Sequence, residues 1–293
     1  MSAGERLPGT PTPMHTWTGA GGITIAGDTW GDPIGPLVVL QHGGGQTRHA
    51  WKGAGETLGN AGYHAVAFDA RGHGDSDWAP PDAYSHDYMV GDLIAVVEAL
   101  GGQRPILVGA SMGGGVSLVA VGEKHLEASA LVLVDMAPRI DPEGTRRIRE
   151  FMSQKPEGFD SLEEVAEAIA NYLPHRPRPR QLDGLAKNVR LGADGKYHWH
   201  WDPARRFGRS DAMETGYRER LYESANHLDL PTLLVRGGLS DVLSEAGAQS
   251  FLEQCPHAEY VNVDNAAHMV AGDRNDIFAS SVIAFLKRVV PAR

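Results

Sequence analysis

The sequence predicts an α/β protein in which helices cover both faces of a parallel sheet. Short apolar runs, typical of strands buried on both faces, alternate with helical segments along most of the chain. Each of these runs ends in a turn that is rich in glycine or in polar residues. The chain has 293 residues, of which 42% are hydrophobic and 22% charged, and this is enough to bury a sizeable core.

The first half of the chain carries the clearest pattern. Residues 1–13 are rich in proline, glycine and threonine and predict a flexible tail. Residues 22–31 alternate, carry glycine at both ends and predict part of an antiparallel hairpin. Continuous apolar runs predict buried strands at 37–40, 64–68, 106–108 and 130–134. Helices are predicted at 51–60, 87–100 and 113–125, and the second ends at Gly101-Gly102.

The strand pattern breaks between residues 138 and 228 and resumes afterwards. This segment has a predicted helix at 161–173 and no predicted buried strand. We expect a mostly helical lid here, since structureless loops of this length are rare in compact domains. Strands are then predicted at 233–235 and 260–263, and helices at 244–254 and 276–290. The core is therefore expected to comprise residues 1–137 and 229–293, with the lid at 138–228.

The segment Gly109-Ala110-Ser111-Met112-Gly113 joins a predicted strand to a predicted helix. A strand, a sharp turn and a helix in this order form a nucleophile elbow, with Ser111 at the apex. The backbone there is strained, and only small residues fit two positions before and after the serine, where Gly109 and Gly113 stand. The N–H groups at the start of the helix favour negative charge developing beside the hydroxyl. The alternative interpretation is a plain glycine–serine turn.

Other chemically capable residues also follow predicted strands. The segment 42–45 follows one strand, and Asp135, Asp241 and His268 each follow a strand of their own. Because ligands bind at the carboxyl ends of strands in an open parallel sheet, these side chains are expected at one edge with Ser111. Serine needs a base to become a good nucleophile, histidine can take and return the proton, and a carboxylate can orient the imidazole.

These motifs together resemble those of the α/β-hydrolase-fold enzymes over nearly the whole chain. They are His42-Gly43-Gly44-Gly45, Asp69-x-Arg71-Gly72-His73-Gly74-Asp75-Ser76, Gly109-Ala110-Ser111-Met112-Gly113-Gly114, Ser240-Asp241 and Ala267-His268. The resemblance implies a mostly parallel eight-stranded sheet with a helical lid inserted after the sixth strand. It implies Ser111 as nucleophile, His268 as base and Asp241 as acid. It also implies an oxyanion hole made by the backbone N–H groups of Gly44 and Met112.

Several of these assignments have alternatives. Asp135 ends the strand at 130–134, where some relatives carry the acid, but order and spacing relative to His268 favour Asp241. We expect His42 to be a hydrogen-bonded structural histidine beside the oxyanion loop, although it is also a candidate for the substrate pocket. Trp199 and Trp201 either line that pocket or pack in the core of the lid.

Composition excludes several classes of function. The formal net charge of −10 leaves no basic surface for nucleic acid or anionic membranes. No apolar stretch is long enough to span a bilayer. The single cysteine, Cys255, cannot form an internal disulfide and is expected to be a packed thiol. Neither a metal motif nor a dinucleotide-binding motif is present, so we expect no metal and no cofactor.

We therefore expect a cytoplasmic serine hydrolase whose partner is a small-molecule substrate, namely a small or medium carboxylic ester or lactone. The resemblance keeps two other reactions open, hydrolysis of carbon–carbon bonds in ring-cleavage products and cofactor-free perhydrolysis. A serine at the elbow argues against the epoxide hydrolases and haloalkane dehalogenases, which carry aspartate there. A non-catalytic small-molecule receptor of the same fold is the alternative from another class. The sequence leaves open a homodimer and a native start at Met1 or Met14.

Overall fold

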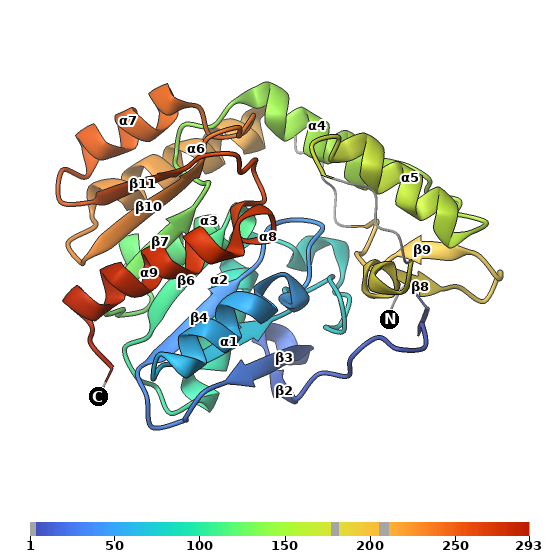
Figure 1. The fold of residues 1–293 in the computed structure, drawn as a ribbon, viewed down its shortest axis with the longest axis horizontal. Helices are drawn as coiled ribbons and strands as arrows, with labels where there is room; N and C mark the ends of the chain where they lie inside the picture. Colours follow the sequence, from blue (N-terminus) through green and yellow to red (C-terminus); the bar gives the residue numbers. More distant parts are fainter. Residues whose placement is uncertain (1–3, 177–181, 205–210, 293) are drawn as a thin grey trace.

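The large sheet of the computed structural model has eight strands, as expected, and lies between two layers of helices (Figure 1). The structure describes residues 4–176, 182–204 and 211–292. The sheet strands are β2 (His15–Thr18), β3 (Thr24–Trp30), β4 (Leu37–Gln41), β5 (His64–Phe68), β6 (Ile106–Ala110), β7 (Ala130–Val134), β10 (Thr232–Gly237) and β11 (Glu259–Val263). Their order is β11-β10-β7-β6-β4-β5-β3-β2. Strand β3 pairs antiparallel with β2 and β5, and all other neighbours are parallel.

The helices divide between the two faces of this sheet. One face is covered by α1 (Lys52–Asn60), α8 (Val270–Asp273) and α9 (Asn275–Val289). The other is covered by α2 (His86–Ala99), α3 (Met112–Gly122), α6 (Asp211–Asn226) and α7 (Glu245–Gln254). Side chains alternate between the faces along a strand, so Val38 packs on the α1 side and Val39 on the α3 side. Each fully buried side chain of this size contributes roughly 1.5–3 kcal/mol to folding.

The segment expected to form the lid, residues 138–228, is called the insertion below. It follows β7, the sixth strand of the large sheet. It contains α4 (Pro142–Ser153) and α5 (Leu162–Tyr172), whose N-termini are capped by the side chains of Asp141 and Ser161. It also contains the short strands β8 (Val189–Leu191) and β9 (Tyr197–Trp199), which pair antiparallel. The prediction of no buried strand here was wrong, because strands this short leave too little apolar pattern to recognise. Helix α6, also within 138–228, packs against α3 of the core.

The segment predicted as a flexible tail is a strand over part of its length. Strand β1 (Glu5–Arg6) pairs antiparallel with β8 and makes the small sheet three-stranded. The carbonyl of Pro11 accepts a hydrogen bond from Arg48 Nη2 at 3.2 Å. Composition alone did not reveal this, because the partner edge lies in the distant insertion. The first three residues of the predicted tail, 1–3, lie outside the described residues.

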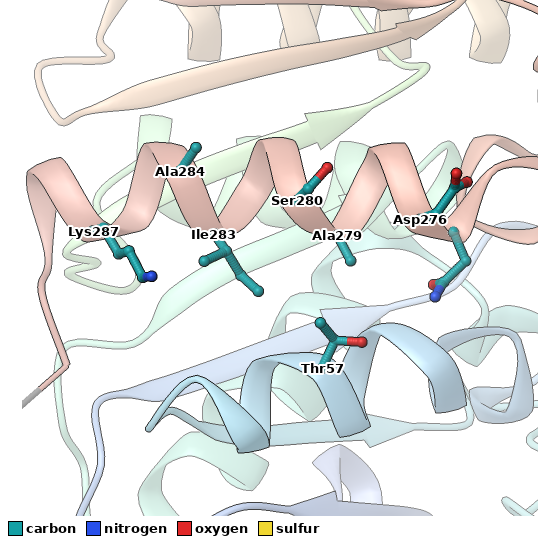
Figure 2. A pocket seen from close by; sticks show the side chains of 8 residues that line it. Thr57, Asp276, Ala279, Ser280, Ile283, Ala284 and Lys287 are labelled. Carbon is teal, nitrogen blue, oxygen red and sulfur yellow. The ribbon is translucent and has the colours of Figure 1, made fainter.

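An open groove of about 420 Å³ lies between α1 and α9 (Figure 2). It is lined by Thr57, Asn275, Asp276, Ala279, Ser280, Ile283, Ala284 and Lys287. None of these is a residue that the sequence singled out, so the groove is separate from the predicted site. Among the helices of the described ranges, none is long and apolar enough to cross a membrane.

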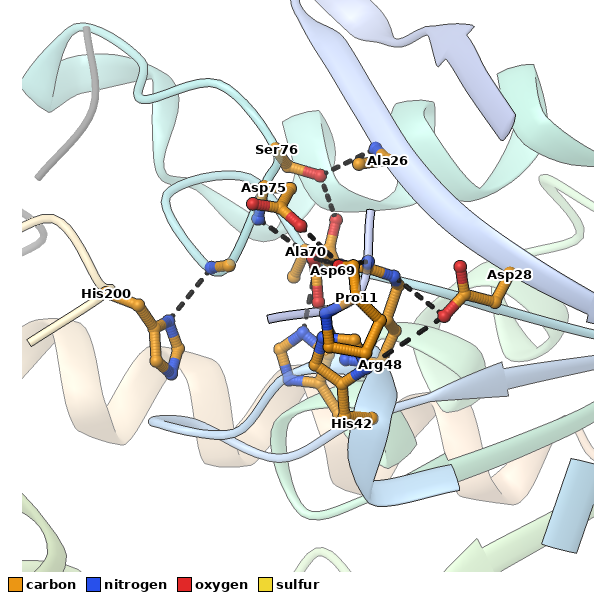
Figure 3. A network of polar contacts seen from close by, with 12 residues as sticks. Pro11, Ala26, Asp28, His42, Arg48, Asp69, Ala70, Asp75, Ser76 and His200 are labelled. Atoms are coloured by element: carbon orange, nitrogen blue, oxygen red, sulfur yellow. Dashed lines mark hydrogen bonds and ion pairs between the residues drawn. The ribbon is translucent and has the colours of Figure 1, made fainter. Parts of the chain in front are cut away.

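A buried arginine holds the turn after β5. Arg48 is fully buried, and its guanidinium contacts Asp28 at 2.9 Å, Asp69 at 2.6 Å and Asp75 at 2.9 Å (Figure 3). Asp69 also accepts the backbone N–H groups of Arg48 and Asp75. Burial raises the pKa of Asp69, but Arg48, His42 and these N–H donors outweigh burial and hold the pKa below its ordinary value. The turn is therefore fixed around a charged carboxylate.

Replacing Arg48 with methionine should lower the free energy of unfolding by about 3–5 kcal/mol near pH 7, because Asp69 would stay buried and charged without its partner. The deficit should shrink as the pH falls toward about 4. In the native protein the lowered pKa of Asp69 stabilises the fold above the pKa of the unfolded chain. In the variant, burial raises that pKa above the unfolded value, and protonation at lower pH relieves the cost. Urea unfolding of both proteins across this range measures the difference.

The control is Arg146→Met, which removes an arginine whose salt bridge to Glu143 lies on the exposed surface. Its unfolding free energy should change by less than about 0.5 kcal/mol. An Arg48→Met deficit that stays constant down to pH 4 would contradict the assigned role of Asp69.

Candidate active site

Ser111 stands at a strained turn between β6 and α3. Its φ of 45° and ψ of −109° lie in a region that residues with a side chain rarely adopt. A Cβ atom on Gly109 would lie 2.4 Å from the carbonyl oxygen of Gly113, and one on Gly113 would lie 2.5 Å from that of Gln41. Side chains at either position would force the backbone apart, so the turn requires glycine at both. This is the local geometry of a nucleophile elbow.

His268 is paired with a carboxylate, but the carboxylate is that of Asp135. The distance from His268 Nδ1 to Asp135 Oδ2 is 2.6 Å, and the Asp135 side chain is fully buried. Asp135 Oδ1 accepts the backbone N–H of Gly237 at 2.9 Å, and Oδ2 accepts the hydroxyl of Ser240 at 2.5 Å. A proton on Nδ1 that donates to Asp135 leaves the lone pair of Nε2 open to act as a base.

Asp241, the residue that the spacing favoured as acid, lies elsewhere. Its side chain is 43% exposed and accepts a hydrogen bond from Arg147 of α4 at 2.5 Å. The turn after β10 directs the side chain of Ser240 toward Asp135, whereas that of the next residue, Asp241, points to the insertion. Both aspartates stand between Ser111 and His268 in the chain, so order alone did not separate them.

The loop after β4 lies beside Ser111. A Cβ atom on Gly43 would lie 3.4 Å from the Cβ of Ser111. The N–H of Gly43 donates to Gln46 Oε1, while no acceptor within the described ranges contacts the N–H of Gly44. Met112 is the first residue of α3, and the first N–H groups of a helix point out of its N-terminal end. The two N–H groups expected to form the oxyanion hole thus come from elements that meet at Ser111.

His42 is a structural histidine, as expected. It is 1% exposed, and its Nε2 accepts the N–H of Ala70 at 3.0 Å. Its Nδ1 therefore carries the proton and donates to the carbonyl of Gly43 at 2.8 Å. The ring orients the loop after β4 and has no role as a second base in this arrangement.

The two tryptophans of the insertion pack in its interior. The rings of Trp199 and Trp201 stack with centroids 4.7 Å apart and are almost fully buried beside Phe151. Core packing, the second of the two interpretations, is thus the role that burial supports. Trp201 Nε1 donates to the carbonyl of Met152 at 3.1 Å. The sulfur of Met152 would lie 3.6 Å from a Cβ on Gly44, so Met152 is one of the insertion residues that border the loop after β4.

The loop that carries His268 is tied to the insertion. Asp273 Oδ2 accepts the N–H of Ala267 at 2.9 Å, and its Oδ1 contacts Arg176 Nε at 2.6 Å and His175 Nε2 at 3.2 Å. Asp273, Met152 and Ser240 were not predicted as site residues. Only Ser240 gave a signal, since it adjoins Asp241 in the motif.

Neither the cysteine thiol nor a cluster of metal ligands competes with this site among the described residues. Cys255 is buried, and burial raises the pKa of its thiol to about 11, so the reactive thiolate is disfavoured. Within the same ranges, no group of three or more histidine, cysteine, aspartate and glutamate side chains is arranged to hold a metal ion.

Comparison with known proteins identifies the family of the chain. A family model described as the alpha/beta hydrolase fold matches residues 36–274. Esterase Rv0045c of Mycobacterium tuberculosis is 27% identical over 270 residues, which cover 90% of this chain and 86% of the esterase. A 3-hydroxybutyrate-oligomer hydrolase of Cupriavidus necator is 28% identical over 261 residues, which cover 85% of this chain and 88% of that enzyme.

Solved structures give the same result. The crystal structure of an E-2-(acetamidomethylene)succinate hydrolase superimposes with a TM-score of 0.81 at 23% identity, covers 93% of this chain, and shares its fold. All of that structure's chain is covered. The structure of Esterase Rv0045c superimposes with a TM-score of 0.72 at 27% identity, with 95% of this chain and 92% of the esterase covered. Family and relatives favour catalysis over the receptor alternative. The chain belongs to the alpha/beta hydrolase family and is an enzyme, a hydrolase.

Proposed function

We propose that the protein is a serine hydrolase in which Ser111 is the nucleophile, His268 the base and Asp135 the acid. The observation that carries this proposal is the 2.6 Å hydrogen bond from His268 Nδ1 to the buried carboxylate of Asp135. The strained turn at Ser111 and the adjacent loop after β4 support it. In the described part of the chain Ser111 and His268 are not hydrogen-bonded, and such contacts often tighten only when substrate binds.

The proposed reaction has two halves. His268 Nε2 takes the proton of the Ser111 hydroxyl as its oxygen attacks the substrate carbonyl, and Asp135 stabilises the imidazolium that forms. The N–H groups of Gly44 and Met112 bind the oxyanion, and each such donor is worth about 3–4 kcal/mol in the transition state. His268 then protonates the leaving group, and the acyl group stays on Ser111. Water, deprotonated by His268, releases the acid product and restores the enzyme.

For the substrate we propose a small or medium carboxylic ester or lactone. An esterase and a 3-hydroxybutyrate-oligomer hydrolase among the relatives support ester bonds as the class. Carbon–carbon bond hydrolysis and perhydrolysis would use the same catalytic residues. The substrate that is turned over, and not the geometry of the site, would therefore distinguish these reactions from ester hydrolysis.

A cytoplasmic location and a small-molecule partner complete the proposal. A lone, buried cysteine supports a compartment in which disulfides are not needed. Cell fractionation tests the location, and light scattering after size exclusion separates a monomer from a homodimer.

Ser111→Ala should lower hydrolysis of p-nitrophenyl esters by at least about 10³-fold, because the attacking oxygen is lost. A fluorophosphonate should add one covalent label to the wild type and none to the variant, as read by intact mass. Thermal unfolding of both proteins serves as the control for folding. A folded wild type that takes no label, or an Ser111→Ala variant that does, would overturn the assignment of the nucleophile.

Asp135→Asn should lower kcat by about 10²–10⁴-fold, because the amide cannot stabilise the imidazolium and favours the wrong tautomer of His268. Asp241→Asn is the matched control. It should stay within about threefold of the wild type, since Asp241 forms an exposed salt bridge. Steady-state kinetics with one ester, together with the melting temperature of each variant, make the comparison. A larger loss in Asp241→Asn would return the acid to the position that the spacing favoured.

Turnover rates measured on a panel of compounds, all at the same concentration, should identify the substrate class. Esters with acyl chains of increasing length and simple lactones should turn over, with a ring-cleavage diketone and hydrogen peroxide plus acetate much slower, by at least about tenfold. Ser111→Ala gives the background for each compound. Preferred turnover of the diketone or of the peroxide reaction would replace the ester proposal with the corresponding alternative.

A further inference from the structure

Three buried histidines form a row from the core into the insertion. The rings of His42 and His73 lie 5.1 Å apart between centroids, and those of His73 and His200 lie 5.8 Å apart. All three side chains are at most 1% exposed. His73 stands in the turn after β5. Figure 3 shows the outer two rings: His42 follows β4, and His200 follows β9 of the insertion. The row thus links the loop after β4 to a segment far away in sequence.

Two of these rings hold both polar groups of one residue, Gly45. The N–H of Gly45 donates to His73 Nε2 at 3.2 Å. The carbonyl of Gly45 accepts from His200 Nε2, at 3.3 Å, because the other ring nitrogen of His200 is already an acceptor: its Nδ1 accepts the N–H of Gly74 at 2.9 Å. Gly45 has a φ of 72°, a conformation in which glycine is favoured, and the two rings hold it there.

The orientation of Gly45 matters because it adjoins Gly44. Peptide units are planar and trans, so the N–H of Gly44 points opposite to the carbonyl of Gly43. That carbonyl is held by His42 Nδ1 at 2.8 Å and by the N–H of Gln46 at 3.1 Å. Hydrogen bonds on the following residue, Gly45, hold the other side of Gly44. The direction of the Gly44 N–H is therefore set from both sides by buried imidazoles.

We propose that His200 is a positioning residue for the oxyanion hole, and that the insertion supplies it by holding Gly45. The inference rests on the proposed function, in which the N–H of Gly44 binds the oxyanion. It assigns a fixed role to the part of the insertion around β8 and β9, in contrast to a lid that moves as one body.

Further contacts keep this part of the insertion on the core. The N–H of Asp202 donates to the carbonyl of Gly72 at 2.8 Å, and the Asp202 carboxylate accepts the hydroxyl of Tyr84. Arg190 of β8 contacts Asp75 at 2.9 Å. All of these contacts are made with the chain that follows β5. They therefore fix the position of the His200 ring relative to the turn after β5 and to Gly45.

The His200 ring stays neutral at ordinary pH. Burial is the main cause, and Arg190 adds to it, so that the pKa falls to about 3. The proton on Nε2 is therefore retained across the pH range in which a serine hydrolase is assayed, and Nδ1 remains an acceptor for Gly74.

Two substitutions distinguish the roles of the two ring nitrogens of His200. The oxygen of asparagine can stand in for Nδ1 and keep the bond from Gly74, whereas the amide nitrogen of glutamine can stand in for Nε2 and donate to Gly45. We expect His200→Asn to lower kcat about tenfold with KM within about twofold. His200→Gln should retain kcat within about threefold. The rate of fluorophosphonate labelling should follow kcat, because both reactions develop charge in the oxyanion hole.

His198→Asn is the matched control, since His198 lies on β9 and pairs with the exposed Asp194. It should leave kcat unchanged. Equal losses in His200→Asn and His200→Gln that follow their melting temperatures would show a merely structural role and overturn the inference. Wild-type kcat in His200→Asn would overturn it too. Should both variants fail to fold, nitrogen-15 NMR of the wild-type histidines decides, since a proton on Nδ1 of His200 would contradict the proposed bond to Gly45.

The failure of this inference is distinct from that of the proposed function. A wild type that is labelled at Ser111, with His200 variants behaving as the control does, overturns only the role of His200. A folded wild type that neither hydrolyses esters nor takes the label overturns the proposed function and this inference together.

Discussion

The site depends on two strained turns at the carboxyl ends of neighbouring parallel strands. Ser111 after β6 has a φ of 45°, and Asp135 after β7 has a φ of 49°. Such conformations cost about 1–3 kcal/mol each and persist only where the surrounding structure determines them. Here the sheet does so, because the N–H of Ser111 donates to Val134 and that of Asp135 donates to Val235. The parallel ladder thus continues to the last residue of each strand, and the side chains turn toward the edge where His268 lies.

The buried arginine and histidines behind this edge have hydrogen-bond or ion-pair partners for their polar groups. The charge of Arg48 is balanced by buried carboxylates, among them Asp69, and His42, His73 and His200 each use one ring nitrogen as donor and the other as acceptor. Burying these groups would be costly if any were left without a partner. Core and insertion share the network, so the support of the loop after β4 does not belong to the sheet alone.

Much of the fold and the candidate nucleophile followed from local pattern. Apolar runs of strand length, each ending in glycine or polar residues, were enough to predict a parallel sheet. The eight mostly parallel strands that the family resemblance implied are confirmed. The turn at Ser111 was predictable because steric crowding at a sharp turn demands glycine at fixed spacing. The short strands β1, β8 and β9 were not predictable, since two or three residues carry no period and their partners are remote in sequence.

The sequence by itself determined the class of fold, the elbow at Ser111 and the place of His268 after the last strand, because each depends on neighbouring residues. Tertiary structure alone decided that His268 pairs with Asp135 and that Asp241 faces Arg147. The reason is that the direction of a side chain after a strand depends on the local backbone dihedrals, on its rotamer and on the contacts that hold it, which spacing does not encode. It likewise decided that His200 reaches Gly45, a contact between segments that only folding brings together.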